Sequence, residues 1–308
     1  MRLRLLDLDG SLTLQPSLRR TVERVQGQVV DLRAEGPGLR LWASRAQMHA
    51  FSELLARLPP VAGEGVEVTF LGSGDFHHLS AALIAARAEA LTLVHFDNHP
   101  DWVRLPPAYH CGSWVNRVLD LPHVVRVLTI GPCSDDLDRP QTKGGNLSAL
   151  GHGKLELYPW RHAPSRIWGR IGSGPGRRRE GGYLVWRNLA DEDIDGFFTE
   201  LMARVPTDAV WITIDKDVLA PEAALTNWDQ GEMPLAVLLK GIAHVAAKKR
   251  LLGIDICGEY APPQFDSLLK RMAAWLDHPH EAAPAPAAVE RNDRTNAALL
   301  EVIEAVAA

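Results

Sequence analysis

Short apolar runs of strand length alternate along the chain with longer segments whose apolar residues recur at helical spacing. The strand-like runs occupy residues 3–8, 66–71, 91–96, 124–130, 155–158, 183–186, 210–214 and 250–257. The helical segments occupy residues 43–58, 79–90, 114–121, 192–203, 235–248, 263–276 and 294–307. This alternation is typical of a mostly parallel sheet with helices on both faces. We therefore expect a single α/β domain over residues 1–308.

Two segments interrupt the alternation. Residues 171–182 are rich in glycine and arginine, but no G-K-[ST] sequence follows them. We therefore expect an exposed loop or lid there, not a phosphate-binding loop. Residues 280–288 have the composition of a linker.

The apolar run at residues 91–96 is followed directly by side chains that bind metals. Asp97, His99 and Asp101 alternate along the chain, so an extended backbone would turn all three to one side. Carboxylate oxygens and imidazole nitrogens together suit Mn²⁺, Zn²⁺ or Fe²⁺ better than a metal that prefers thiolates.

Two further strand ends carry side chains of the same kinds. The stretches are T-F-L-G-S-G-D-F-H-H at residues 69–78 and V-W-I-T-I-D-K-D-V-L-A-P at residues 210–221. They supply His77, His78, Asp215 and Asp217. Core packing does not require a carboxylate at the end of each buried strand, because unpaired buried charge is costly. Sites in open parallel sheets form beyond the carboxyl ends of strands, so the sequence predicts one metal site there.

Composition narrows the class of protein. A net charge of -5 gives no electrostatic reason to expect a nucleic-acid partner, and no apolar run is long enough to span a bilayer. The three cysteines, Cys111, Cys133 and Cys257, are scattered and odd in number, which argues against a disulfide framework and for a reducing compartment. We expect a cytoplasmic protein that acts on a small molecule; association into a homo-oligomer stays open.

The ordered set G-S-G-D-F-H-H, D-N-H-P-D and I-D-K-D-V-L-A-P resembles the signature of the ureohydrolase superfamily, which includes arginase, agmatinase and formimidoylglutamase. The resemblance spans about residues 66–260. It implies a three-layer α/β/α fold with a mostly parallel central sheet. It also implies two Mn²⁺ ions bridged by hydroxide, with Zn²⁺, Fe²⁺ or Ni²⁺ as alternatives.

The resemblance implies a role for each matching residue. His77 matches the family's first metal ligand, with His78 as the competing assignment because the loop carries extra residues. The other matching ligands are Asp97, His99, Asp101, Asp215 and Asp217. Asp101 also matches a carboxylate that accepts a hydrogen bond from the hydroxide. Glu259, in G-I-D-I-C-G-E-Y, resembles the glutamate that holds the guanidinium of the substrate, a natural pairing for a carboxylate.

Several departures from the family pattern concern the substrate. Ala220 replaces the acidic residue before the family's proline, and residues 103–114 lack the S-x-N-x-H-G element that recognises an α-amino acid in arginases. His110 is the candidate for the family's proton-shuttle histidine, with an ordinary loop histidine as the alternative. Trp228 lies where the family has a Gly/Thr/Pro-rich loop and could cover the site or pack against it. We therefore expect a guanidinium or amidine substrate other than free L-arginine.

The mechanism implied by the resemblance is hydrolysis. Two ions that share a water lower its pKa from 15.7 toward neutrality, so hydroxide can attack a guanidinium carbon. His110 would then donate a proton to the leaving amine.

Two other functions remain open at this point. A zinc deacetylase of related fold would use His77 and His78 as its catalytic pair, and a non-catalytic scaffold would keep the ligands without turnover. The metal content of the chain separates the three, because they predict two Mn²⁺ ions, one Zn²⁺ ion or none.

Overall fold

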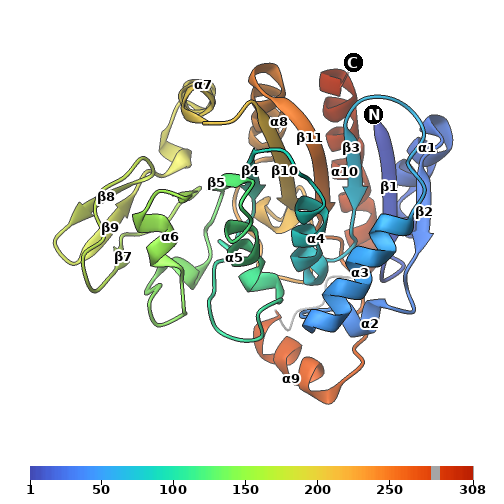
Figure 1. The fold of residues 1–308 in the computed structure, drawn as a ribbon, viewed down its shortest axis with the longest axis horizontal. Coiled ribbons are helices and arrows are strands. Elements are labelled where there is room, and N and C mark those ends of the chain that lie inside the picture. Colours follow the sequence, from blue (N-terminus) through green and yellow to red (C-terminus); the bar gives the residue numbers. More distant parts are fainter. Residues whose placement is uncertain (279–284, 308) are drawn as a thin grey trace.

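A computed structural model of the chain describes residues 1–278 and 285–307. Its centre is an eight-stranded sheet in the order β2-β1-β3-β11-β10-β4-β5-β6, in which every neighbouring pair is parallel (Figure 1). The strands are β1 (Arg2–Asp7), β2 (Gln28–Asp31), β3 (Glu67–Phe70), β4 (Leu91–Phe96), β5 (Val124–Ile130), β6 (Leu155–Tyr158), β10 (Ala209–Asp215) and β11 (Arg250–Cys257). The predicted parallel sheet is confirmed.

Helices cover both faces of the sheet and bury two apolar cores. Successive residues of a strand face opposite cores, as Ile212 and Trp211 of β10 do. Each fully buried aliphatic side chain contributes about 1.5–3 kcal/mol of stability, so both faces of such strands require a helical layer. The helices on the Ile212 side are α1 (Pro16–Val25), α7 (Ile194–Arg204), α8 (Leu235–Lys248) and α10 (Ala285–Ala307). Those on the Trp211 side are α3 (Arg45–Arg57), α4 (Ser80–Ala85), α5 (Trp114–Leu119) and α6 (Leu147–Gly151).

The glycine- and arginine-rich segment differs from the predicted loop. Part of it is strand β8 (Arg177–Glu180), which pairs antiparallel with β9 (Tyr183–Trp186). Strand β7 (Ser165–Arg166) completes a small three-stranded sheet beside the main one (Figure 1). The sequence did not indicate this hairpin, because the three consecutive arginines of β8 give no apolar alternation of the kind that predicts a strand.

Other differences lie at the ends of the chain. Helix α1 and edge strand β2 were not predicted, because β2 offers only two apolar residues and α1 has a short apolar stripe. The predicted helix over residues 263–276 is the shorter α9 (Leu268–Asp277), and the terminal helix α10 begins earlier than expected. Of the predicted linker, residues 280–284 lie outside the described residues and residues 285–288 belong to α10.

The carboxyl ends of the strands with ligand-type side chains lie side by side. Strand β10 pairs directly with β4, and β11 separates β10 from β3. Because all of these strands are parallel, their ends meet at one edge of the sheet, as the sequence predicted. Within residues 1–278 and 285–307, no helix has the length and apolar character needed to cross a membrane.

Candidate metal centre and active-site pocket

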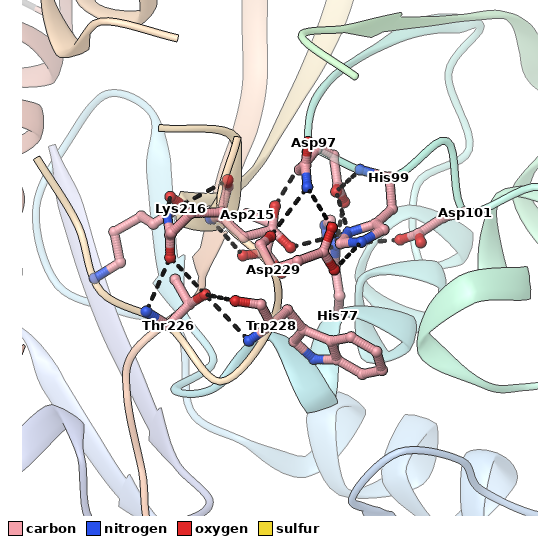
Figure 2. A network of polar contacts seen from close by, with 12 residues as sticks. His77, Asp97, His99, Asp101, Asp215, Lys216, Thr226, Trp228 and Asp229 are labelled. Carbon is pink, nitrogen blue, oxygen red and sulfur yellow. Dashed lines mark hydrogen bonds and ion pairs between the residues drawn. The ribbon is translucent and has the colours of Figure 1, made fainter. Parts of the chain in front are cut away.

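One group of buried ligand-type atoms surrounds the imidazole of His77, on the 3-10 helix Gly74–Leu79 that follows β3. Its Nδ1 lies 3.0 Å from Asp97 Oδ2, 3.4 Å from Asp101 Oδ2 and 3.7 Å from Asp215 Oδ2. Figure 2 shows these side chains converging from the ends of β4 and β10 and from the 3-10 helix. His77 thus belongs to two overlapping groups of ligand-type atoms, one with Asp97 and Asp101 and one with Asp215, which together make the first candidate metal cluster.

A second group adjoins the first through the Asp97 carboxylate. His99 Nδ1 lies 3.5 Å from Asp97 Oδ1 and 3.0 Å from Asp217 Oδ2. Asp97 therefore presents Oδ2 to the His77 group and Oδ1 to the His99 group. The structure thus brings all six predicted ligands into two neighbouring clusters, the arrangement needed for two ions.

The two adjacent histidines lie differently with respect to the carboxylates. His77 faces the carboxylates, whereas His78 lies outside both clusters. Both ring nitrogens of His78 are buried without a hydrogen-bond partner, and burial together with the nearby His110 and Lys270 lowers the pKa of His78 to about 3. His78 is therefore a neutral, buried imidazole away from the candidate metal site.

The four carboxylates carry more negative charge than their buried surroundings can hold. Burial and Asp97 raise the pKa of Asp101 to about 8. Burial, Asp215 and Asp97 raise the pKa of Asp217 well above its usual range. Burial would lower the pKa of His77, but its anionic neighbours raise it well above the usual range. A proton or a metal cation must compensate this charge, since unpaired buried charge is costly.

Hydrogen bonds fix which nitrogen of each histidine faces the carboxylates. Thr213 Oγ1 donates to Asp255 Oδ1 at 2.7 Å, so it accepts from His77 Nε2 at 2.9 Å. His77 Nδ1, buried and without a hydrogen-bond partner, is then the nitrogen that faces the cluster, and it would offer a lone pair to a cation that displaces its proton. His99 Nε2 similarly lies 2.9 Å from Asp229 Oδ1, which leaves Nδ1 toward Asp217. Such outer contacts are typical of histidines that bind metals.

Sequence reasoning missed two side chains at the clusters. His95 Nε2 lies 2.8 Å from Asp97 Oδ2, and the alternation of Asp97, His99 and Asp101 extends back to this position, so the signal was present. Cys257, the last residue of β11, donates its thiol to Asp215 Oδ2 at 3.2 Å. Burial and Asp215 raise the pKa of Cys257 well above its usual range, which keeps it a thiol.

Trp114 holds the Asp101 carboxylate in place. The indole Nε1 donates to Asp101 Oδ2 at 2.5 Å, and the indole ring packs against His77 with centroids 4.8 Å apart. Asp101 itself has a φ of 48°, a left-handed conformation that is uncommon for residues other than glycine. Strain of this kind persists where the surroundings fix it, and it clusters at functional sites.

A pocket of about 610 Å³ opens over both clusters. His110 lines it together with the ligand residues, and burial lowers the pKa of His110 below its usual value. Trp228 also lines the pocket and donates its indole N–H to Asp75 Oδ1 at 3.0 Å, so it forms part of the wall. The predicted proton carrier and the candidate metal site therefore share one cavity.

The structure does not bring Glu259 into this pocket. Its carboxylate is buried and forms an ion pair with Lys216. It also accepts hydrogen bonds from three amide side chains: Asn296 Nδ2 at 2.7 Å, Gln15 Nε2 at 2.9 Å and Asn292 Nδ2 at 3.1 Å. Gly258, with a φ of 89°, turns the chain after β11, and Glu259 then meets α10. This position differs from the guanidinium-binding role implied by the resemblance.

Comparisons with known proteins agree with this architecture. No family model matches the chain. An uncharacterized protein of Thermotoga maritima is 30% identical over 198 residues, which are 64% of this chain and 60% of the relative's length.

Solved structures of similar fold include a proclavaminate amidino hydrolase from Streptomyces clavuligerus (16% identity, 86% of this chain and 72% of that one, TM-score 0.53). A formimidoylglutamase from Bacillus subtilis is 14% identical, with 98% of this chain and 85% of that one covered and a TM-score of 0.56. An arginase from Bacillus cereus is 12% identical, with 98% of each chain covered and a TM-score of 0.57. The chain thus has the arginase-like ureohydrolase fold.

Proposed function

We propose that this protein is a metal-dependent hydrolase that cleaves a guanidino or amidino C–N bond. The observation that carries the proposal is the pair of adjoining ligand clusters, which share Asp97 at the floor of one pocket. The likeness in fold to amidino hydrolases and arginases supports the same reaction class.

The ligands that would hold two divalent ions are His77, Asp97, His99, Asp101, Asp215 and Asp217. Oxygen and imidazole ligands of this kind favour Mn²⁺, with Zn²⁺, Fe²⁺ or Ni²⁺ as alternatives. The orphaned Nδ1 of His77 and the uncompensated carboxylates fit such ions. Bound ions would supply a hydroxide nucleophile at neutral pH, because coordination lowers the pKa of water.

The chain's own residues would orient the reactants and move protons. Asp101, fixed by Trp114, would accept a hydrogen bond from the nucleophile. His110 is mainly neutral at pH 7, because burial lowers its pKa, and it must take up a proton before it can donate one to the leaving amine. A guanidino substrate would give urea and an amine.

Metal content and hydrolysis test the proposal together. Protein purified with Mn²⁺ should hold two ions per chain by elemental analysis, and it should release urea from guanidino compounds or formamide from formimino compounds. Asp97→Asn should lose most of the metal, whereas the matched control Asp120→Asn, at an exposed carboxylate, should keep it. Well under one ion per chain, with Asp97→Asn no different from its parent, would contradict the proposal.

The two alternatives make different predictions in the same experiment. A zinc deacetylase would hold one Zn²⁺ and cleave an acetylated amine; its paired histidines lack support, because His78 lies outside the clusters. A non-catalytic scaffold would hold no metal and would turn over none of the compounds. Two features favour a non-catalytic scaffold: Glu259 lies outside the pocket, and Ala220 stands where the family has an acidic residue.

A further inference from the structure

We infer that the substrate of this site has an apolar tail and no carboxylate. The inference rests on the proposed hydrolase function and adds to it the class of group that the outer half of the pocket receives. Two independent properties of the pocket lining carry it. Outside the two clusters the lining has the carboxylates of Asp135, Asp136 and Asp229 against the ammonium group of Lys143, and it includes exposed apolar side chains.

The charge of the lining disfavours an acidic substrate. Among the described lining residues, Lys143 is the one lysine or arginine, and its ammonium group is paired with Asp135 and lies 3.4 Å from Asp136. Asp229, whose side chain is 54% exposed, adds a further carboxylate to the lining. A substrate carboxylate would therefore meet anions and find its cation already paired, an arrangement that rejects it by repulsion.

Arg104 does not supply the missing cation. It lies on the exposed part of the loop after β4 and does not belong to the described pocket lining. Substrates that end in an α-amino acid or an acidic chain therefore lack a partner for the carboxylate. A cationic guanidinium head, by contrast, suits the carboxylates of the pocket.

Apolar side chains from three separate segments line the outer part of the pocket, beside the exposed charged side chains of Asp135, Lys143 and Asp229. Trp42 precedes α3, Leu105 and Pro106 belong to the loop after β4, and Leu276 lies on α9. Leu105 is 55% exposed and Leu276 is 71% exposed, so both present free apolar surface to whatever enters. Helix α9 lies beyond the carboxyl ends of the strands in Figure 1, where it borders this entrance.

Apolar surface in a concave pocket favours a ligand that covers it with apolar groups. The cavity of about 610 Å³ falls within the range that holds a drug-sized ligand, so it has room for a tail as well as a guanidinium head. The lining thus fits an arylalkyl or long alkyl guanidine or amidine better than a short amino acid.

The experiment uses two compounds that share a guanidinium group and differ in the group attached to it. Full-length, Mn²⁺-loaded protein would be assayed for urea release from 2-phenylethylguanidine and from 4-guanidinobutanoate, and binding of both would be measured by calorimetry. We expect kcat/KM for the phenyl compound to exceed that for the carboxylate by at least about tenfold, in line with pocket discrimination of small groups.

Two sets of variants connect the preference to the residues. Leu276→Ser should raise KM for the phenyl compound roughly tenfold, whereas the matched control Leu268→Ser, exposed on the same helix but outside the lining, should not. The double variant Asp135→Asn/Asp136→Asn frees Lys143 and should improve kcat/KM for 4-guanidinobutanoate roughly two- to fivefold, the range of an exposed ion pair.

The outcomes separate this inference from the proposed function. A higher kcat/KM for 4-guanidinobutanoate than for 2-phenylethylguanidine would overturn the inference, but it would still support the proposed hydrolase function. Tighter binding of 2-phenylethylguanidine, with hydrolysis of neither compound, would support the inference and contradict the proposed hydrolase function. Binding of neither compound would overturn the inference.

Discussion

The ion pair between Lys216 and Glu259 provides a test of what stabilises the end of β10, where the candidate ligands Asp215 and Asp217 lie. Lys216 lies between Asp215 and Asp217 in sequence, yet its side chain extends away from the clusters (Figure 2). Both members of the pair are essentially inaccessible to solvent. Lys216 Nζ also donates to Asn296 Oδ1 at 3.0 Å, so the pair ties the β10 end to α10.

The expected magnitude follows from burial. Lys216→Met keeps the length of the side chain but leaves the Glu259 carboxylate with amide donors alone. Removal of one partner from a buried ion pair costs about 3–5 kcal/mol, a large share of the roughly 5–15 kcal/mol that stabilises a typical protein. Glu259→Gln should cost a similar amount, because it leaves the Lys216 ammonium buried without its anion.

Urea unfolding followed by circular dichroism measures these losses. The double variant Lys216→Met/Glu259→Gln should lose less than the sum of the single losses by about 1–3 kcal/mol, because each single change leaves one charge unpaired. Glu53→Gln, which breaks the exposed Arg57–Glu53 pair, is the control and should cost under ~0.5 kcal/mol. Single variants within ~1 kcal/mol of the parent, or fully additive losses, would refute the argument.

Two further substitutions test the geometry around the clusters. Thr213→Val removes the acceptor for His77 Nε2 and should weaken metal binding roughly 10- to 100-fold by equilibrium dialysis. Thr213→Ser should retain most of the affinity. Equal affinities for the two variants would show that the hydrogen bond to Thr213 does not direct His77 Nδ1 toward the metal. Gly258→Ala adds a Cβ that would lie 2.5 Å from Asp215 Oδ1 at a φ of 89°, so it should cost about 1–3 kcal/mol in urea unfolding and reduce metal content. Gly182→Ala is the control, because its added Cβ meets no neighbouring atom within 4 Å, and it should change neither stability nor metal content. If Gly258→Ala also left both quantities unchanged, the turn at Gly258 would tolerate a side chain.

The central sheet and the presence of ligand-type side chains at its strand ends were predictable because their signals are local. An apolar run such as residues 91–96 specifies a buried strand, and β4 has these bounds in the structure. Parallel topology then places the ends of all strands at one edge of the sheet. The pairing of β10 with β4 makes Asp97 and Asp215 neighbours, and the alternation of strands and helices alone does not specify that strand order.

The orientation of individual side chains was not predictable in the same way. His77 and His78 are consecutive on a 3-10 helix, where successive side chains point about a third of a turn apart. Only one of them can face the carboxylates, and motif spacing is ambiguous because the loop carries extra residues. The position of Glu259 similarly depends on the left-handed turn at Gly258, which a resemblance between motifs does not encode.

The parts of the molecule behind and in front of the candidate ligands therefore differ in role. Behind the strand ends, α10 and the Lys216–Glu259 pair form a dry, fully bonded support whose amide donors come from residues far away in sequence. In front, the pocket wall includes residues of the loop after β4 and of α9, where Leu276 is largely exposed. Among the described hydrogen bonds and ion pairs, none joins Ala273 or Leu276 of α9 to a candidate ligand, so we expect changes at these two wall residues to alter what fits and to leave the ligands in place. A chain of this fold can thus keep the metal ligands while its substrate preference departs from that of arginases.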